Sequence, residues 1–390
     1  MVYGAAGTPE APITITSTPG GKATIAPDGK APDGKDEHGL VIMDSSNITV
    51  DNVSLAGTSA LPESVGINIW SWSGDDMAGI NVNNVDSNGF KTGLYAGTDA
   101  NAGKIHGLRI ADSTFAGARS NNVATSAHGT GYGLTDVHLH KVVAHGSTGD
   151  PALTDQNSGS GIVLGGVDGG TIDESHAYDN GAHSNASEGP EGIWAYSSRN
   201  ITIQNSLSEN NKTQRTDGDG FGFDIDVYDS KMIGNTSRNN AGAGYLIFTY
   251  GDHETRNILL ENNSSTNDST LPYSFSPIAI LGGLEGSSGT GHVSDVTVRN
   301  NTITLPAGDP RAAIQVGQRV RNITITGNTV SGGAGELDAS SVHDPSQVHH
   351  DKPAPTPPPP PGPTQGSGSS SSGNNGGTFF SWLGGWFGRR

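Results

Sequence analysis

Five carboxylates lie within thirteen residues between Asp217 and Asp229, and no other stretch of the sequence is as rich in groups that could do chemistry. Carboxyl groups can transfer protons, attack as nucleophiles and bind hard cations. Alternation along a strand would place Asp224 and Asp226 on one outward face, about 7 Å apart. Because like charges on one exposed strand face destabilise a fold, a functional role is the better explanation for this pair.

A repeated sequence motif, here termed the repeated phrase, predicts the strands that would position these residues. One short strand pattern, clearest as Asn-Ile-Thr, recurs about ten times between Gly39 and Gly333, each copy with a glycine-led strand before it and an Asn/Ser-rich corner after it. A period from the low twenties to about thirty residues is typical of a solenoid. Strands this short gain a core only by stacking, about 4.8 Å per coil. Clear copies of the phrase are 45–50, 198–203 and 320–325, and clear glycine-led strands begin at Gly161, Gly192, Gly222 and Gly244.

Alternation along each strand then separates core from surface. The side chains expected to point inward are Ile162, Leu164, Ile193, Ala195, Phe223, Ile225 and Ile247. Those expected to face solvent, one above another, are Val163, Trp194, Asp224 and Leu246. Asparagine suits the corners because it tolerates left-handed φ and hydrogen-bonds its own turn.

Aromatic side chains are expected beside the carboxylate pair. The equivalent outward positions hold Trp194 and Tyr196 one coil earlier, and Tyr250 and His253 lie one coil later. A sugar ring needs an apolar face to lie on and acid and base groups to act on its bonds. We therefore predict a catalytic set of Asp224, Asp226 and His253, and a substrate-binding set of Trp194, Tyr196, Arg215, Tyr250, Trp70 and Tyr95.

The repeat resembles the right-handed parallel β-helix superfamily of carbohydrate-active proteins, which includes pectate lyases, polygalacturonases, mannuronan C5-epimerase modules and phage tailspikes. The resemblance covers residues 12–333. It implies an all-β, single-stranded right-handed parallel β-helix of about ten coils, with the handedness that parallel crossovers prefer. It also implies a polysaccharide as the partner.

The segment 222–226, Gly-Phe-Asp-Ile-Asp, is similar to the Gly-Phe-Asp-Pro-His segment of mannuronan C5-epimerases. The resemblance implies a catalytic role for Asp224. Asp226 stands where the family has histidine, so the second acid or base would have to come from elsewhere, the candidates being His253, His183 and Tyr250. Paired aspartates at 75–76 resemble a polygalacturonase motif, but that family's other elements do not follow in order, and we interpret the pair as loop residues.

Asp217 and Asp219 are the candidate metal ligands, since Ca²⁺ binds carboxylate oxygens. Pectate lyases combine Ca²⁺ with an Arg or Lys base, and Arg215 and Lys231 are near enough in sequence for that role. A hydrolase would instead need two carboxylates, about 6.5 to 9.5 Å apart for inversion. Histidines are scattered and form no zinc-protease motif; His138 and His140 share one strand face and are interpreted as surface residues.

Charge and composition exclude several classes of protein. The 390 residues carry 39 acidic and 21 basic side chains, a net charge of −18, so nucleic acid is not expected as a partner. Cysteine is absent, which excludes disulfides and thiolate metal sites. Only 32% of the residues are hydrophobic, yet their periodicity argues for a thin core rather than disorder.

We divide the chain into a β-helix domain at 1–345, a Pro-rich then Gly/Ser-rich linker at 346–377 and an apolar segment at 378–390, with the tail expected to be disordered. The last segment is shorter than the about 20 residues that span a bilayer, so no membrane span is expected. A strand pattern already begins at 13–16 with no signal-peptide pattern before it, so we expect the first coils and any export signal upstream.

These observations predict an extracellular or cell-surface protein that processes a polysaccharide containing uronic acids, as a lyase, an epimerase or a hydrolase. The alternative is a non-catalytic glycan-binding or structural β-helix, in which an aromatic groove binds and nothing turns over. The carboxylate cluster favours the enzyme, because a pure binder does not require it. No sequence feature marks an oligomer interface.

Overall fold

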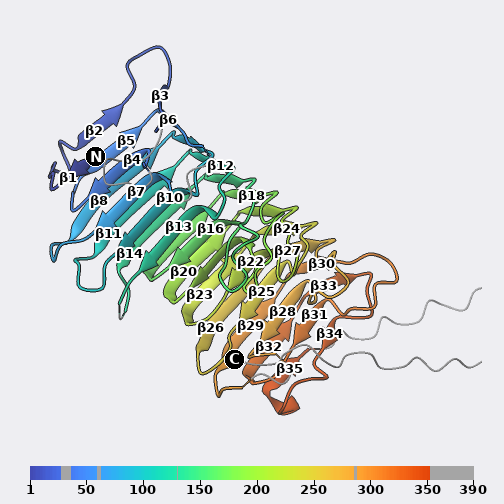
Figure 1. The fold of residues 1–390 in the computed structure, drawn as a ribbon. Helices are drawn as coiled ribbons and strands as arrows, with labels where there is room; N and C mark the ends of the chain where they lie inside the picture. Colours follow the sequence, from blue (N-terminus) through green and yellow to red (C-terminus); the bar gives the residue numbers. More distant parts are fainter. Residues whose placement is uncertain (28–36, 59–62, 130, 285–287, 352–390) are drawn as a thin grey trace, which may run out of the picture. The chain divides into compact units, whose positions relative to one another are not determined.

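The computed structural model describes residues 1–27, 37–58, 63–129, 131–284 and 288–351. These residues form a right-handed parallel β-helix of three sheets whose coils follow one another in sequence order (Figure 1). Every third strand joins the same sheet, which confirms the predicted solenoid. Each described coil except the last carries three strands rather than the two expected: the Asn/Ser-rich corner contains a short strand of its own, such as β21 (Leu207–Glu209).

Sheet 1 contains the glycine-led strands. In order they are β1 (Val2–Tyr3), β4 (Leu40–Met43), β7 (Val65–Ser71), β10 (Thr92–Thr98), β13 (Asn121–Ala127), β16 (Ser160–Gly165), β19 (Glu191–Tyr196), β22 (Asp219–Phe223), β25 (Tyr245–Phe248), β28 (Ile278–Leu281), β31 (Ile314–Val316) and β34 (Leu337–Asp338).

Sheet 2 contains the Asn-Ile-Thr strands. They are β2 (Ile13–Thr16), β5 (Ile48–Asp51), β8 (Met77–Asn83), β11 (Ile105–Ala111), β14 (Leu134–His140), β17 (Val167–Asp173), β20 (Ser198–Gln204), β23 (Val227–Ile233), β26 (Glu254–Glu261), β29 (His292–Arg299), β32 (Val320–Thr326) and β35 (Val348–His350).

Sheet 3 contains the short corner strands. They are β3 (Ala23–Ile25), β6 (Val53–Ala56), β9 (Asp86–Asn88), β12 (Thr114–Ala116), β15 (Val143–His145), β18 (His176–Tyr178), β21, β24 (Thr236–Arg238), β27 (Ser264–Thr266), β30 (Thr302–Thr304) and β33 (Thr329–Ser331).

The asparagine of the repeated phrase has a backbone role. Asn47, Asn200 and Asn322 have φ of 54°, 57° and 51°, the left-handed region that most residues avoid. Asparagine, aspartate and glycine reach this region at the lowest cost. Other coils therefore carry aspartate or glycine at the same place, as at Asp229 and Gly169, and this explains why the phrase is degenerate.

Buried asparagines also tie successive coils together at the corners. In one ladder Asn180 Nδ2 donates to Asn211 Oδ1 at 3.0 Å, and Asn211 Nδ2 donates to Asn240 Oδ1 at 2.9 Å. A second ladder links Asn235, Asn263, Asn301 and Asn328 in the same way. Each amide thus satisfies its neighbour's donors inside the solenoid, where an unpaired polar group would be costly.

Most of the predicted core is confirmed. Ile162, Leu164, Ile193, Ala195, Phe223 and Ile247 are fully buried in one continuous cluster that runs through the coils. Ile225 is an exception: it is only half-buried, because β22 ends at Phe223 and Ile225 lies in the turn that follows.

The described β-helix extends past residue 345. A 3₁₀ helix, η1 (Pro345–Gln347), leads into β35, which pairs with β32, so sheet 2 continues through His350. The predicted start of the linker at residue 346 is therefore too early. Most of that linker and the apolar segment at 378–390 lie outside the described residues. In the part of the chain that is described, no helix is long and apolar enough to span a bilayer.

Candidate carboxylate site on the outer face of sheet 1

The register of β22 differs from the one expected. The strand begins at Asp219 and not at Gly222 as predicted: Asp219 pairs with Glu191, and Trp194 pairs with Gly222. The predicted pairing of Asp224 with Trp194 on neighbouring strands is therefore wrong, because Gly222 takes that position. Two successive Gly-Phe steps at 220–223 allow either alignment, and the leading glycine is Gly220. A Cβ at the equivalent Gly192 would lie 2.0 Å from Ser208 Oγ, so this corner position requires glycine.

Asp224 and Asp226 do not share an outward face, which corrects the predicted pair. Asp226 lies in the turn between β22 and β23, with φ of 56°. Its Oδ2 is 2.6 Å from His253 Nδ1, and its Oδ1 accepts a hydrogen bond from the Tyr228 hydroxyl at 3.1 Å. Asp226 thus contacts His253, whereas Asp224 lies in a different group of carboxyls.

That group, here termed the carboxylate cluster, consists of Glu191, Asp217, Asp219 and Asp224. Glu191 and Asp219 are 3% and 0% exposed, whereas Asp217 and Asp224 are half-buried. Glu191 Oε2 is buried without a hydrogen-bond partner among the described residues, and the equally buried carboxyl of Asp219 has the Ala243 amide nearby. Within the same residues no ion pair involves any member of the cluster. Buried carboxyl groups left this way are costly unless they hold a proton.

Burial raises the pKa of every member of the carboxylate cluster. It raises the pKa of Asp224 to about 7, with the charge of Asp217 adding to the effect and a hydrogen bond from the Ile225 amide opposing it. It raises the pKa of Asp217 to about 6, although the Gly189 amide donates to Asp217 Oδ2 at 2.7 Å. The pKa values of Glu191 and Asp219 lie well above their usual range, first from burial and then from neighbouring carboxylates.

Glycines make room for the two deepest carboxyls. A Cβ at Gly222 would lie 1.8 Å from Glu191 Oε2, and one at Gly242 would lie 1.9 Å from Asp219 Oδ1. Each carboxyl therefore lies over bare backbone of the next coil. A side chain at either glycine would displace a carboxyl of the cluster.

Aromatic residues adjoin the cluster but are more buried than expected. Trp194 points away from the solenoid core, yet it is only 7% exposed, because it packs with Ala124 and Val163 and against Tyr95 and Tyr196. Its Nε1 donates to Ser160 Oγ at 3.1 Å. Val163 and Leu246, also predicted to face solvent, are 4% exposed. The outer face of sheet 1 is thus covered, which alternation alone cannot reveal.

The segments that lead from sheet 3 into β16, β19 and β22 are 146–159, 179–190 and 210–218, and all three are longer than the segment before β13, at 117–120. The second of them supplies the Gly189 amide that binds Asp217. Arg215 is exposed on the segment before β22, and its guanidinium donates to the Thr154 carbonyl at 3.4 Å.

The predicted aromatic stripe extends toward the N-terminal coils. The rings of Trp70 and Tyr95 stack with centroids 5.8 Å apart and planes 18° apart, and His128 meets Trp70 edge-on. The Ser126 hydroxyl hydrogen-bonds with both Tyr95 and Tyr196, whose pKa values burial raises. The stripe therefore reaches from Trp70 to the edge of the carboxylate cluster.

Tyr250 lies between the two acidic groups. Its ring is 5.8 Å from that of His253, and it is 38% exposed. Burial raises its pKa, and the charges of Glu188, Asp224 and Asp226 add to the rise. Tyr250 is thus the predicted residue that is electrostatically coupled to both Asp224 and Asp226.

Asp217 and Asp219 remain predicted calcium ligands that the structure does not test directly. Among the described residues, the one set of three His, Cys, Asp or Glu side chains with ligand atoms all within 4.8 Å of one another lies elsewhere, on sheet 2. The carboxylate cluster therefore does not form a compact oxygen cage as it stands.

Glu191 is the main residue that the sequence analysis missed. A signal was available: Glu191 and Asp219 each stand directly before the leading glycine of a sheet 1 strand on successive coils. Because such residues pair side by side in a parallel sheet, the repetition predicts two neighbouring carboxyls. Glu188 is the second omission, and burial and Asp155 raise its pKa.

Comparison with known proteins gives structural matches only. No protein-family model and no curated protein matches the sequence. A GH136 lacto-N-biosidase from Eubacterium ramulus matches with a TM-score of 0.56 at 14% identity, over 90% of this chain and 60% of its own length. A DFA-IIIase from Arthrobacter chlorophenolicus A6 without its lid matches with a TM-score of 0.55 at 12% identity, over 84% of this chain and 87% of its own length.

A mannuronan C-5 epimerase module from Azotobacter vinelandii matches more loosely, with a TM-score of 0.41 at 14% identity, over 86% of this chain and 91% of the module. The chain spans about 60% of the length of the lacto-N-biosidase. At these identities the matches establish the fold and leave the chemistry to the residues of this chain. The protein is a right-handed parallel β-helix protein.

Proposed function

We propose that the protein cleaves or transfers glycosidic bonds in a neutral glycan, with Asp224 as the general acid and Asp217 as the carboxylate base or nucleophile. One observation carries the proposal: two half-buried carboxyls on the outer face of sheet 1 have pKa values raised to about 7 and about 6. Tyr250, which is 38% exposed and feels the charge of Asp224, could hold a sugar ring beside them.

The pKa of Asp224 is higher than that of Asp217, as a general acid working beside an ionised base or nucleophile requires. Near pH 6.5, midway between the two pKa values, most copies of Asp224 hold a proton while most copies of Asp217 are ionised. Asp224 would donate its proton to the oxygen of the leaving group as the bond from that oxygen to the anomeric carbon breaks. Asp217 would then accept a proton from the attacking water or hydroxyl, or attack the anomeric carbon itself. The charges of Asp217 and Glu188 favour the protonated form of Asp224, because they add to the rise in its pKa that burial causes.

The charge of the site favours a neutral substrate over one containing uronic acids. The carboxylate cluster has no ion-paired cation within the described residues, and the whole chain carries a net charge of −18. A uronate would bring further negative charge beside these groups. Lyase and epimerase reactions would also need a cation to stabilise the charge that develops at the uronate, a role that Ca²⁺ or the exposed Arg215 would have to fill.

The structural matches support glycan processing in general. The lacto-N-biosidase and the DFA-IIIase are carbohydrate-active enzymes, and both match over more than four fifths of this chain. We accordingly also propose that the protein works outside the cytoplasm or at the cell surface, where polymeric glycans are found.

The test is a panel of neutral and uronate-containing oligosaccharides and polysaccharides, incubated with and without Ca²⁺ or a chelator. We expect new reducing ends or transfer products, identified by mass spectrometry, on at least one neutral glycan and without dependence on Ca²⁺. Ultraviolet absorbance of unsaturated uronate products would identify a lyase instead and overturn the proposal. Binding without turnover would support the alternative of a non-catalytic glycan-binding protein.

A further inference from the structure

Two histidines and an aspartate meet on the outer face of sheet 2, on a different sheet from the carboxylate cluster. His138 and His140 are two residues apart on β14, so their side chains project from the same face. Asp173 is the partner of His140 on the adjacent strand β17. Neighbouring parallel strands are about 4.8 Å apart, so the three side chains converge.

Their polar atoms already point at one another. His138 Nε2 is 2.9 Å from Asp173 Oδ1, and His140 Nδ1 is 3.0 Å from Asp173 Oδ2. The three potential ligand atoms all lie within 4.8 Å of one another, the one such set of three among the described residues. The side chains are 41%, 34% and 15% exposed, so an ion could reach them from solvent.

Nearby cations are occupied by other carboxylates. Arg109, the neighbour of His138 on β11, forms an ion pair with Asp136. Lys141 pairs with Glu174 at 3.7 Å. The positive charges around the site are therefore largely neutralised, and they would oppose a bound cation only weakly.

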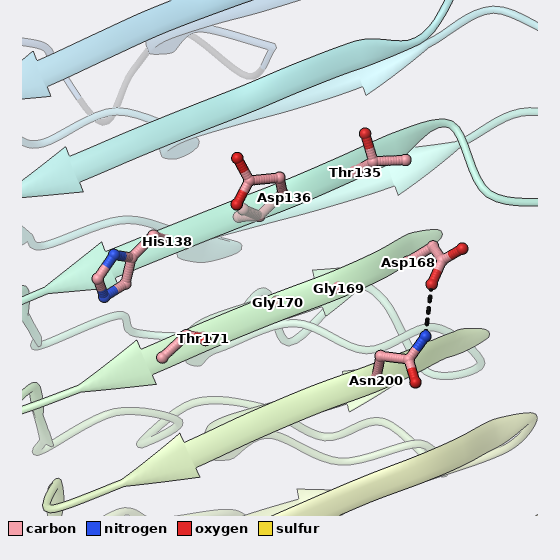
Figure 2. Close-up of a pocket in the computed structure, with 9 residues that line it drawn as sticks. Thr135, Asp136, His138, Asp168, Gly169, Gly170, Thr171 and Asn200 are labelled. Atoms are coloured by element: carbon pink, nitrogen blue, oxygen red, sulfur yellow. Dashed lines mark hydrogen bonds between the residues drawn. The ribbon is translucent and has the colours of Figure 1, made fainter.

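The site borders a hollow that leaves one side open. Figure 2 shows His138 and Thr171 at one end of this hollow and the hydrogen-bonded Asp168 and Asn200 at the other. Gly169 and Gly170 line it between them and have no side chains to fill it. Water or an oxygen ligand therefore has room beside His138, the one proposed ligand that lines the hollow.

We propose that His138 Nε2, His140 Nδ1 and one carboxylate oxygen of Asp173 bind a divalent first-row transition-metal ion of the Zn²⁺ class. Two imidazoles with one carboxylate match the ligand preference of Zn²⁺, Cu²⁺ and Ni²⁺ and not that of Ca²⁺ or Mg²⁺. The ion would replace the two hydrogen bonds to Asp173 and link β14 to β17. This inference is independent of the proposed function.

The test is calorimetric titration of the full chain with Zn²⁺ alone, with Mg²⁺ in a parallel titration, followed by absorption spectra with Co²⁺ as a spectroscopic substitute. The test variant is His138→Ala with His140→Ala. The matched control is His145→Ala with His176→Ala, which also removes two outward histidines from neighbouring strands, β15 and β18, but outside this set. His140→Gln serves as a milder variant if the double variant does not fold.

We expect one Zn²⁺ per chain, no heat with Mg²⁺, and visible Co²⁺ bands typical of low coordination. The affinity for Zn²⁺ should fall at least about 10-fold in the test variant and in His140→Gln, and the Co²⁺ bands should vanish, while the control keeps both. Unchanged Zn²⁺ affinity in the test variant, equal loss in the control, or no binding by the wild type would each overturn the proposal.

Discussion

The outer faces of sheet 1 and sheet 2 follow the same alternation on the same coils, yet they differ in the burial and pairing of their charged side chains. On sheet 2, charges are exposed and paired: Arg199 lies 2.7 Å from Asp168, with side chains 46% and 25% exposed. On sheet 1, the carboxylate cluster is buried or half-buried and has no ion pair within the described residues.

The sheet 2 ion pair is typical of a solvated surface, whereas the carboxyls on the outer face of sheet 1 have raised pKa values. Exposed ion pairs contribute little to stability and perturb little else. Buried carboxyls without counter-charges cost stability and shift their pKa values, which is how enzymes prepare acids and bases for neutral pH. Long segments, 179–190 and 210–218, lead into the two coils that carry the carboxylate cluster, and the first of them supplies the Gly189 amide that binds Asp217.

The largest effect is expected from Asp224→Asn. The substitution preserves shape but removes the proton donor, so turnover of the glycan found in the panel should fall by about 10²-fold or more. The melting temperature should stay the same or rise, since one unfavourable carboxyl is gone. Asp168→Asn on sheet 2 is the matched control and should keep full activity. Strong destabilisation of Asp224→Asn with no loss of turnover per folded molecule would mean that Asp224 is structural.

Trp194→Ala is expected to lower the free energy of unfolding by about 3 kcal/mol, as large-to-small changes at buried aromatics do. The residue lies outside the solenoid core but is 7% exposed, and its Nε1 hydrogen bond to Ser160 would also be lost. Thr202→Ala, at a half-buried outward position of sheet 2, should change stability by less than about 0.5 kcal/mol. Equal, small changes in urea unfolding would show that the outer face of sheet 1 is not packed as described.

The fold could be predicted from the sequence because its signals are local and repeated. Left-handed φ at the corner residues Asn205 and Asn210 and burial of Ile193 follow from neighbouring residues alone, and both were predicted. The register of β22 could not be settled this way, since Gly220 and Gly222 offer two alignments that differ by two residues and both keep inward positions apolar.

The contacts that bury side chains on the outer face of sheet 1 could not be predicted from the sequence either. Segments such as 179–190 have no periodic pattern, and their contacts, including the Gly189 amide on Asp217, depend on where the chain returns in space. Burial of Trp194 likewise depends on its packing with Ala124 and Val163 from neighbouring coils. The carboxyls were therefore partly found as a set, but their partners and protonation were not.

The dependence of stability on pH should have opposite signs on the two faces. The pKa of Asp224 is raised to about 7, so its favourable contribution is complete below about pH 3.8 and is lost as pH rises through 7. The pKa of Asp168 is lowered, mainly by the hydrogen bond from Arg199, so its contribution is present above about pH 3.8 and lost in acid.

We therefore expect Asp224→Asn to gain about 1 to 2 kcal/mol relative to wild type between pH 4 and 8, allowing for partial screening by solvent. Asp168→Asn should show no such gain in this window. Urea unfolding at several pH values measures both differences, and subtraction of the wild type removes the shared titration of the histidines. A flat difference for Asp224→Asn would argue against a raised pKa, and with it against its role as the acid.

The smallest effect is expected from Arg199→Ala. The guanidinium is exposed, and after its removal Asp168 still accepts a hydrogen bond from Asn200 Nδ2 at 2.8 Å, so no carboxylate is stranded. The free energy of unfolding should fall by less than about 1 kcal/mol, including the loss of the guanidinium from the face of Tyr132, 4.9 Å away. Turnover should equal that of the wild type, because Arg199 lies on sheet 2 and the proposed acid and base lie on sheet 1. A clear loss of turnover at unchanged stability would mean that glycan also contacts sheet 2, and the functional contrast between the two faces would no longer hold.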